Sequence, residues 1–245
     1  MIESKIVQKF GNGGHIVLSK EYVGKKVKFL LDTKSFNDIK SEILDILEPY
    51  LENILGVYLH GSYAINEQSP ESDINILVVV GEYEKIDDVD DYSIDTISLK
   101  GLEKKLKEDA IFIIPKLSEA KTIINPELLK GYKDCRFTKG NTKYYLEQTK
   151  IIINLNKTWI KMGYGLGVSS LISVIRGLYM IKWENYSKSS FLGFLEDHGL
   201  DTGKLYELYY KEQRRIKVKD SSTVSKEDLR KLVKLAEEML SVRKN

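Results

Sequence analysis

The chain has 245 residues and a mass of 28.2 kDa, which is enough for a large buried core and for more than one domain. Hydrophobic residues make up 42% and charged residues 30% of the chain, which excludes the disordered, collagen-like and low-complexity classes. The single cysteine, Cys135, excludes an internal disulfide, and the longest aliphatic run, Ile76–Val80, is too short to span a bilayer. We therefore expect a soluble cytoplasmic protein with no export signal and no membrane segment.

The formal net charge of +2 conceals an uneven distribution along the chain. Residues 1–31 carry six basic and two acidic residues, residues 32–135 carry 11 and 22, and residues 136–245 carry 21 and 12. An acidic middle between two basic ends predicts three units. The basic ends could contact a triphosphate, DNA or RNA, or the opposite charges could simply hold the units together.

The first unit, residues 1–33, has the pattern of a small basic β-hairpin module. Strands are predicted at residues 5–10, 15–18 and 26–31, with a glycine-rich turn at Gly11–Gly14. The stretch from Phe10 to Val27 resembles the swapped-hairpin modules of AbrB/MazE-type DNA-binding proteins. That resemblance implies a homodimer of intertwined chains whose lysines are free to meet phosphate. The alternative is a hairpin packed on its own chain.

The second unit, residues 36–132, is predicted to be an α+β domain with a mixed sheet. Apolar residues at helical spacing follow Phe36, and a strand at Leu55–His60 leads into a short helix near Tyr63. The remaining expected elements are strands at Ile74–Val80 and Tyr92–Leu99, a helix at Leu102–Lys107, and apolar segments at Ile111–Ile114 and Lys121–Ile124.

The third unit, residues 137–245, is predicted to be a helical bundle, because strand signals end after Arg136. Helices are expected at residues 142–162, 168–184, 188–197, 201–215 and 225–243, the last opened by a capping box of Ser225 and Asp228. The pattern resembles HEPN and related substrate-binding bundles. Arg176 lies inside an apolar helix, where it needs an acidic partner or a phosphate, and we assign it to nucleotide binding. It lacks the nearby histidine of HEPN ribonucleases, so a ribonuclease is not supported.

The chemistry is predicted to gather around the end of the strand at Leu55–His60. Gly61 and Ser62 follow this strand, and a strand-to-helix turn of this kind lets backbone N–H groups and a hydroxyl approach phosphate oxygens. Asp73 and Asn75 alternate at period two, so both side chains leave one face of the next strand. That face can hold a divalent metal ion.

Asp95 is a further candidate ligand, because it interrupts the apolar strand that begins at Tyr92. An unpaired carboxylate inside such a strand would cost several kcal/mol, so it needs either a metal ion or a partner such as a lysine. The isolated histidines His15 and His60, by contrast, are better explained as packed residues than as ligands.

The order Gly61-Ser62, Asp73-x-Asn75 and Ile94-Asp95 resembles the DNA polymerase β-like nucleotidyltransferase superfamily, in particular its minimal and aminoglycoside types. The resemblance implies that Gly61 and Ser62 hold the phosphates of an NTP. It further implies a two-metal Mg²⁺ site at positions 73, 75 and 95, with Asp73 and Asp95 as the catalytic acids. The implied reaction transfers a nucleoside monophosphate to the hydroxyl of an acceptor that the sequence does not identify.

Two positions depart from that family pattern. Asn75 stands where a second acid is expected, and an amide oxygen binds Mg²⁺ more weakly than a carboxylate. Ile65-Asn66 stands where a basic residue is often found, which removes a phosphate contact. The alternative interpretation is therefore a catalytically degenerate regulator of toxin–antitoxin type that binds an NTP or a partner and contacts DNA through its N-terminal module.

Overall fold

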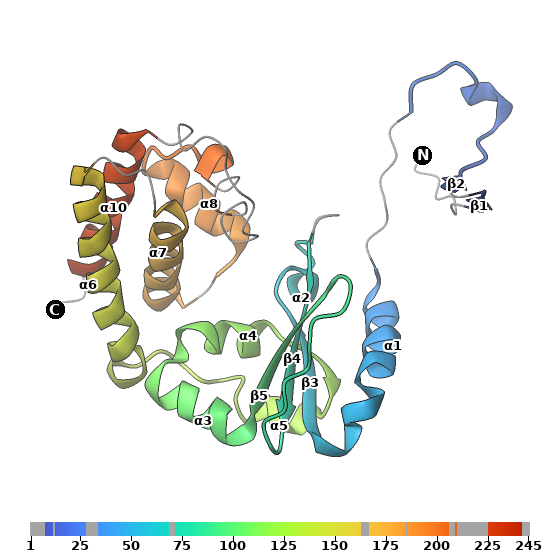
Figure 1. Cartoon of the computed structure of the whole chain (residues 1–245), viewed down its shortest axis with the longest axis horizontal. Helices are drawn as coiled ribbons and strands as arrows, with labels where there is room; N and C mark the ends of the chain where they lie inside the picture. Colours follow the sequence, from blue (N-terminus) through green and yellow to red (C-terminus); the bar gives the residue numbers. More distant parts are fainter. Residues whose placement is uncertain are drawn as a thin grey trace. The chain divides into compact units, whose positions relative to one another are not determined.

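The computed structural model describes residues 8–11, 13–27, 34–68, 72–162, 167–184, 186–205, 209 and 225–241 (Figure 1). The chain forms two compact units, Met1–Lys34 and Ser35–Asn245. The larger unit contains both the sheet and the helical region that follows it. The α+β fold class expected from the sequence is confirmed.

The N-terminal unit contains one small hairpin. Strand β1 (Gln8–Phe10) pairs antiparallel with β2 (Gly13–His15), and a 3₁₀ turn, η1 (Lys20–Tyr22), follows. The second strand was predicted two residues later, at 15–18. That prediction is wrong because the turn closes at Gly11, whose φ of +57° suits glycine, so the next two glycines enter the ladder.

The structure describes only part of the first and third strands that were predicted in the N-terminal unit. Residues 26–27 of the predicted third strand are not in a strand, and residues 28–31 lie outside the described residues, as do residues 5–7 of the first. None of the described side chains in this unit is buried, and Phe10 and Val23 are 72% and 80% exposed.

The larger unit opens with helix α1 (Phe36–Leu47). Ser35 caps it in a capping box with Asp38, and its buried residues, Ile39, Ile43 and Leu47, follow helical spacing. Pro49 lies at the start of the 3₁₀ segment η2 (Glu48–Asn53), which leads directly into the sheet. The start and the buried face of α1 are therefore determined by its own sequence.

The sheet has four strands in the order β5-β4-β3-β6. They are β3 (Ile54–His60), β4 (Ile74–Val80), β5 (Tyr92–Ser98) and β6 (Lys121–Ile124). β3 pairs antiparallel with both β4 and β6, whereas β4 and β5 are parallel. The sheet is thus mixed, as predicted.

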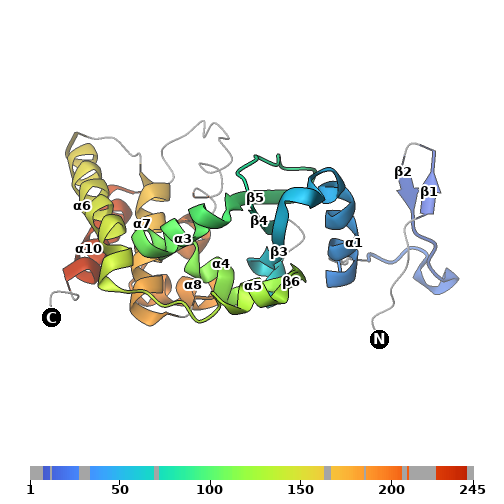
Figure 2. The ribbon, with the colours of Figure 1, turned by 90° about the horizontal axis from the view of Figure 1, so that it is seen from below.

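Both faces of the sheet are covered, and α1 lies on the face opposite α3 and α4 (Figures 1 and 2). On the α1 face, Ile74, Ile76 and Val78 join the core that α1 buries. On the other face, Leu77 and Val79 pack with Tyr58 and with residues of the following helices. Alternation at period two separates the two cores, and it leaves Asn75 on the α3 and α4 face.

The second core is completed by helical elements that follow β5 and β6. These are α3 (Leu99–Glu108), η3 (Ala110–Phe112), α4 (Ile114–Glu119) and α5 (Pro126–Lys130). The apolar segment expected at 111–114 is therefore divided between a 3₁₀ turn and α4, because Pro115 falls in the first turn of a new helix.

The C-terminal region is helical, as predicted. It contains α6 (Lys139–Met162), α7 (Val168–Trp183), α8 (Lys188–Asp197) and α10 (Lys226–Ser241), and residues 202–205 are also helical. The remainder of the helix predicted at 201–215 lies outside the described residues, apart from Asp201 and Tyr209. Helices α6, α7 and α10 lie side by side (Figure 2), and Leu171, Phe191 and Leu232 belong to their shared, fully buried core.

Within the described part of the chain, no helix is long and apolar enough to cross a membrane.

Candidate functional site

The predicted phosphate-binding turn lies where β3 ends. His60 is the last residue of the strand, and Gly61 precedes the four-residue helix α2 (Ser62–Ile65) with φ +72° and ψ −155°. A Cβ atom at Gly61 would lie 3.3 Å from the amide nitrogen of Asn75. The backbone angle therefore favours glycine here, and a larger residue would also crowd the Asn75 side chain. The Ser62 hydroxyl is carried at the same turn, as the sequence predicted.

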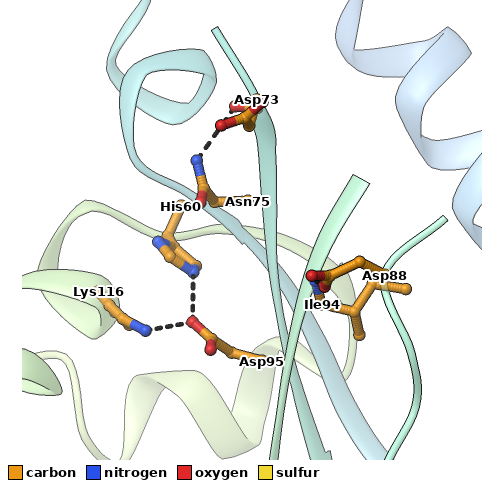
Figure 3. A network of polar contacts seen from close by, with 7 residues as sticks. All are labelled: His60, Asp73, Asn75, Asp88, Ile94, Asp95 and Lys116. Atoms are coloured by element: carbon orange, nitrogen blue, oxygen red, sulfur yellow. Dashed lines mark hydrogen bonds and ion pairs between the residues drawn. The ribbon is translucent and has the colours of Figure 1, made fainter. Parts of the chain in front are cut away.

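Asp73 and Asn75 lie beside this turn because His60 and Asn75 are opposite each other in the β3–β4 ladder. Asp73 is exposed just before β4 begins, and Asn75 is partly exposed. The Asn75 side-chain N–H donates to the backbone carbonyl of Asp73 over 3.1 Å (Figure 3). Since the nitrogen makes this contact, the amide oxygen is the atom left to bind a cation.

Asp95 lies on the neighbouring strand and on the same face, opposite Leu77. The sequence argument treated it as a residue inside an apolar strand, but its side chain is 52% exposed, because β5 is the edge strand of the sheet. Its partner is Lys116 of α4, whose ammonium donates to the Asp95 carboxylate (Figure 3). Of the two partners that the sequence left open, the structure contains the lysine.

His60 lies between Asn75 on β4 and Asp95 on β5 (Figure 3). Its side chain is buried, and Nε2 lies 3.8 Å from the Asp95 carboxylate. Burial, followed by the charge of Lys116, lowers the pKa of His60 to about 4, although Asp95 acts in the opposite direction. The ring is therefore neutral near pH 7 and does not cancel the Asp95 charge. The expectation that His60 is a packed residue is confirmed.

Arg176 lies in α7, where its charge acts on the hydroxyl of Tyr145 on α6. Its role in nucleotide binding stays a prediction without local support. Lys116, in contrast, was missed by the sequence analysis. The one available signal was its position as a lone charge between Ile111 and Leu117.

A cavity of about 500 Å³ adjoins the other side of α4. It is lined by α4, by the segment around Arg136 and by the end of α7 at Trp183. Glu119 of α4 is one of its lining residues. Burial, with a smaller contribution from the charge of Glu67, raises the pKa of Glu119 to about 7.

The side chains only partly suit the two-metal site that the family resemblance implies. Asp73 and the Asn75 oxygen can hold one divalent cation with oxygen ligands. The second position does not fit, because Asp95 is already paired with Lys116 and no group of three His, Cys, Asp or Glu side chains forms a metal site among the described residues. A second divalent ion would have to displace the lysine.

Solved structures with similar chains include a spectinomycin adenyltransferase from Enterococcus faecialis with ATP and spectinomycin, at 13% identity and a TM-score of 0.47, covering 84% of this chain and 99% of that one. A nucleotidyltransferase-like protein from Exiguobacterium sibiricum 255-15 matches at 13% identity and a TM-score of 0.38, covering 84% and 75%. No curated protein matches.

The family comparison covers the region that carries the site. Residues 41–131 match the family described as polymerase beta, nucleotidyltransferase, and this range includes Gly61, Asp73 and Asp95. The resemblances stated for residues 1–33 and 137–245 stay predictions. Residues 41–131 are therefore similar to the nucleotidyltransferase domain of the polymerase beta family.

Proposed function

We propose that residues 36–132 transfer a nucleoside monophosphate from an NTP to an acceptor hydroxyl. The observation that carries this proposal is the β3–β4 register, which sets Gly61 against Asn75 and so brings the phosphate-binding turn to the side chains that can bind a cation. This arrangement falls within the segment that matches the nucleotidyltransferase family. The same match favours a transferase over the binding-protein alternative.

Each residue then has a defined task. The Gly61 backbone and the Ser62 hydroxyl bind phosphate oxygens, since glycine offers no Cβ to block the approach. Asp73, with the Asn75 oxygen, holds the divalent cation that accompanies the NTP, and such an ion neutralises charge that develops on the phosphates. We assign Mg²⁺ to this position, because carboxylate and amide oxygens are hard ligands.

Asp95 acts on the acceptor hydroxyl as the general base. Its carboxylate is exposed and anchored by Lys116, so it can hold the acceptor hydroxyl and accept its proton. The acceptor oxygen forms a bond to the α-phosphorus, the bond from that phosphorus to the bridging oxygen breaks, and pyrophosphate leaves with the electron pair.

Calorimetry and a transfer assay test this proposal together. The full-length protein is titrated with each Mg²⁺-NTP, and pyrophosphate release is followed with pooled hydroxyl acceptors. Asp73→Ala should abolish both nucleotide binding and transfer. Asp45→Ala removes an equally exposed carboxylate from α1, on the opposite face of the sheet, and should change neither.

Nucleotide binding that survives Asp73→Ala would show that the site is misplaced. A wild-type protein that binds no NTP would refute the proposed function.

A further inference from the structure

The candidate site already contains a fixed positive charge. Lys116 is held in place because its neighbours on α4, Ile114 and Leu117, are buried in the core beneath that face of the sheet. Its own side chain is 27% exposed, and its ammonium contacts the Asp95 carboxylate. The packing of α4 therefore places the backbone of Lys116 within reach of Asp95.

The side chains of the site carry less negative charge than three acids would. Asp73 and Asp95 contribute two negative charges, Asn75 contributes none, and Lys116 returns one positive charge, so these side chains sum to about −1. Three carboxylates without the lysine would carry about −3. The side chains present therefore attract a second divalent cation less strongly than three acids would.

The packing around Asn75 supports the same interpretation. Its amide nitrogen is engaged by the Asp73 carbonyl and lies against Gly61, so one side of the amide is fixed by the backbone. The remaining amide oxygen is a single neutral ligand atom for a cation, and it lies beside Asp73. Asn75 can therefore complete one cation site with Asp73, but it cannot bridge to a second ion at Asp95, as a carboxylate with two oxygens can.

We propose that the site binds a single divalent cation with the nucleotide, at Asp73 and Asn75, and that the Lys116 ammonium takes the position beside Asp95 that a second cation would occupy. The inference rests on the proposed transferase function and adds its metal stoichiometry. It assigns one function to two features of the site, since the amide at position 75 and the lysine at position 116 both reduce the demand for a second ion.

Electron paramagnetic resonance with Mn²⁺ tests the stoichiometry without relying on activity. The full-length protein is saturated with methylene-bridged, non-hydrolysable analogues of the four NTPs in turn, and bound Mn²⁺ is counted per bound nucleotide. Wild type should bind one Mn²⁺ and show no coupled-pair spectrum, which two ions about 3.5–4 Å apart would give. Asn75→Asp with Lys116→Gln restores three acids and removes the ammonium, so this double variant should bind two.

The control variants separate charge from other effects. Asn75→Asp alone keeps the ammonium and should still bind one Mn²⁺. Lys121→Gln removes a different lysine, which bonds Asn66 beside α2, and should also bind one.

Two Mn²⁺ ions in wild type or in Asn75→Asp would overturn the inference. So would a single ion in the double variant, provided that circular dichroism shows it folded and it binds nucleotide. If the double variant does not fold, the wild-type count and spectrum decide the question. A wild type that binds none of the analogues refutes the proposed function itself, and this inference with it.

Discussion

Glu119 should make the protein less stable as the pH rises. Its carboxyl has a pKa of about 7, against an ordinary value of 4.5, because of burial first and the charge of Glu67 second. Between these two values the folded state binds more protons than the unfolded state. The free energy of unfolding therefore decreases as the pH rises through this window.

The expected size follows from the shift. One pKa unit corresponds to about 1.4 kcal/mol, so ionised Glu119 lowers the free energy of unfolding by at most about 3 kcal/mol above pH 7, and by less because solvent screens this partly exposed carboxyl. Glu119→Gln keeps the shape of the side chain and cannot ionise. The variant should match wild type near pH 4.5 and be more stable by about 1–3 kcal/mol at pH 8. Glu67→Gln removes the smaller cause and should give a smaller gain.

Urea unfolding followed by circular dichroism measures this difference at each pH. Glu52→Gln, which changes an exposed glutamate on η2, controls for the loss of one negative charge. The reasoning fails if Glu119→Gln changes the free energy of unfolding equally at pH 4.5 and pH 8, or if Glu52→Gln reproduces the effect.

Three further predictions concern packing and assembly. Gly177→Ala should destabilise the protein by about 1–3 kcal/mol, because a Cβ there would lie 2.0 Å from the Tyr145 hydroxyl. Gly193→Ala in α8 is the matched control, because nothing lies within 4 Å of a Cβ there. It should stabilise the protein by about 0.5–1 kcal/mol in the same unfolding assay. Ser35→Ala removes the α1 cap and should cost about 1 kcal/mol by urea unfolding. Removal of residues 1–33, which include the exposed Phe10, Val17 and Val23, should convert a dimer into a monomer by light scattering; a monomeric full-length chain would contradict this.

The elements with strong periodicity could be predicted from the sequence. Strand Ile74–Val80 and the helix at 188–197 were expected with the bounds that the structure shows. The capping box at Ser225 is present, since the Asp228 N–H donates to the Ser225 hydroxyl over 3.0 Å. These features depend on residues close together in the chain, so a local pattern contains the information that determines them.

The N-terminal hairpin and the segment around Pro115 were harder to predict. Four residues, Gly11 to Gly14, allow several turns, and the register depends on which glycine takes the left-handed conformation. The apolar run at 111–114 fits a strand and a helix equally well at that length. In both places the local sequence permits more than one structure, so the pattern alone does not determine the element.

The same limit explains why the site could be assembled from the sequence only in part. The positions of Gly61, Asp73 and Asn75 follow from strand alternation and from one antiparallel pairing, both of which a pattern can express. The partner of Asp95 cannot be predicted in this way. A metal ion and a lysine both satisfy an acid on that strand, and the choice depends on where α4 packs.

The packing of α4 is decided by its apolar residues and not by its charge. Ile114 and Leu117 are buried in the core that includes Tyr58 and Leu77, and the lysine between them is thereby carried to the exposed edge at β5. Nothing in residues 92–98 determines whether a lysine lies beside Asp95. A sequence pattern can therefore identify which side chains are able to bind a cation, whereas the proposed single-cation stoichiometry depends on a lysine whose position is set by the apolar packing of α4.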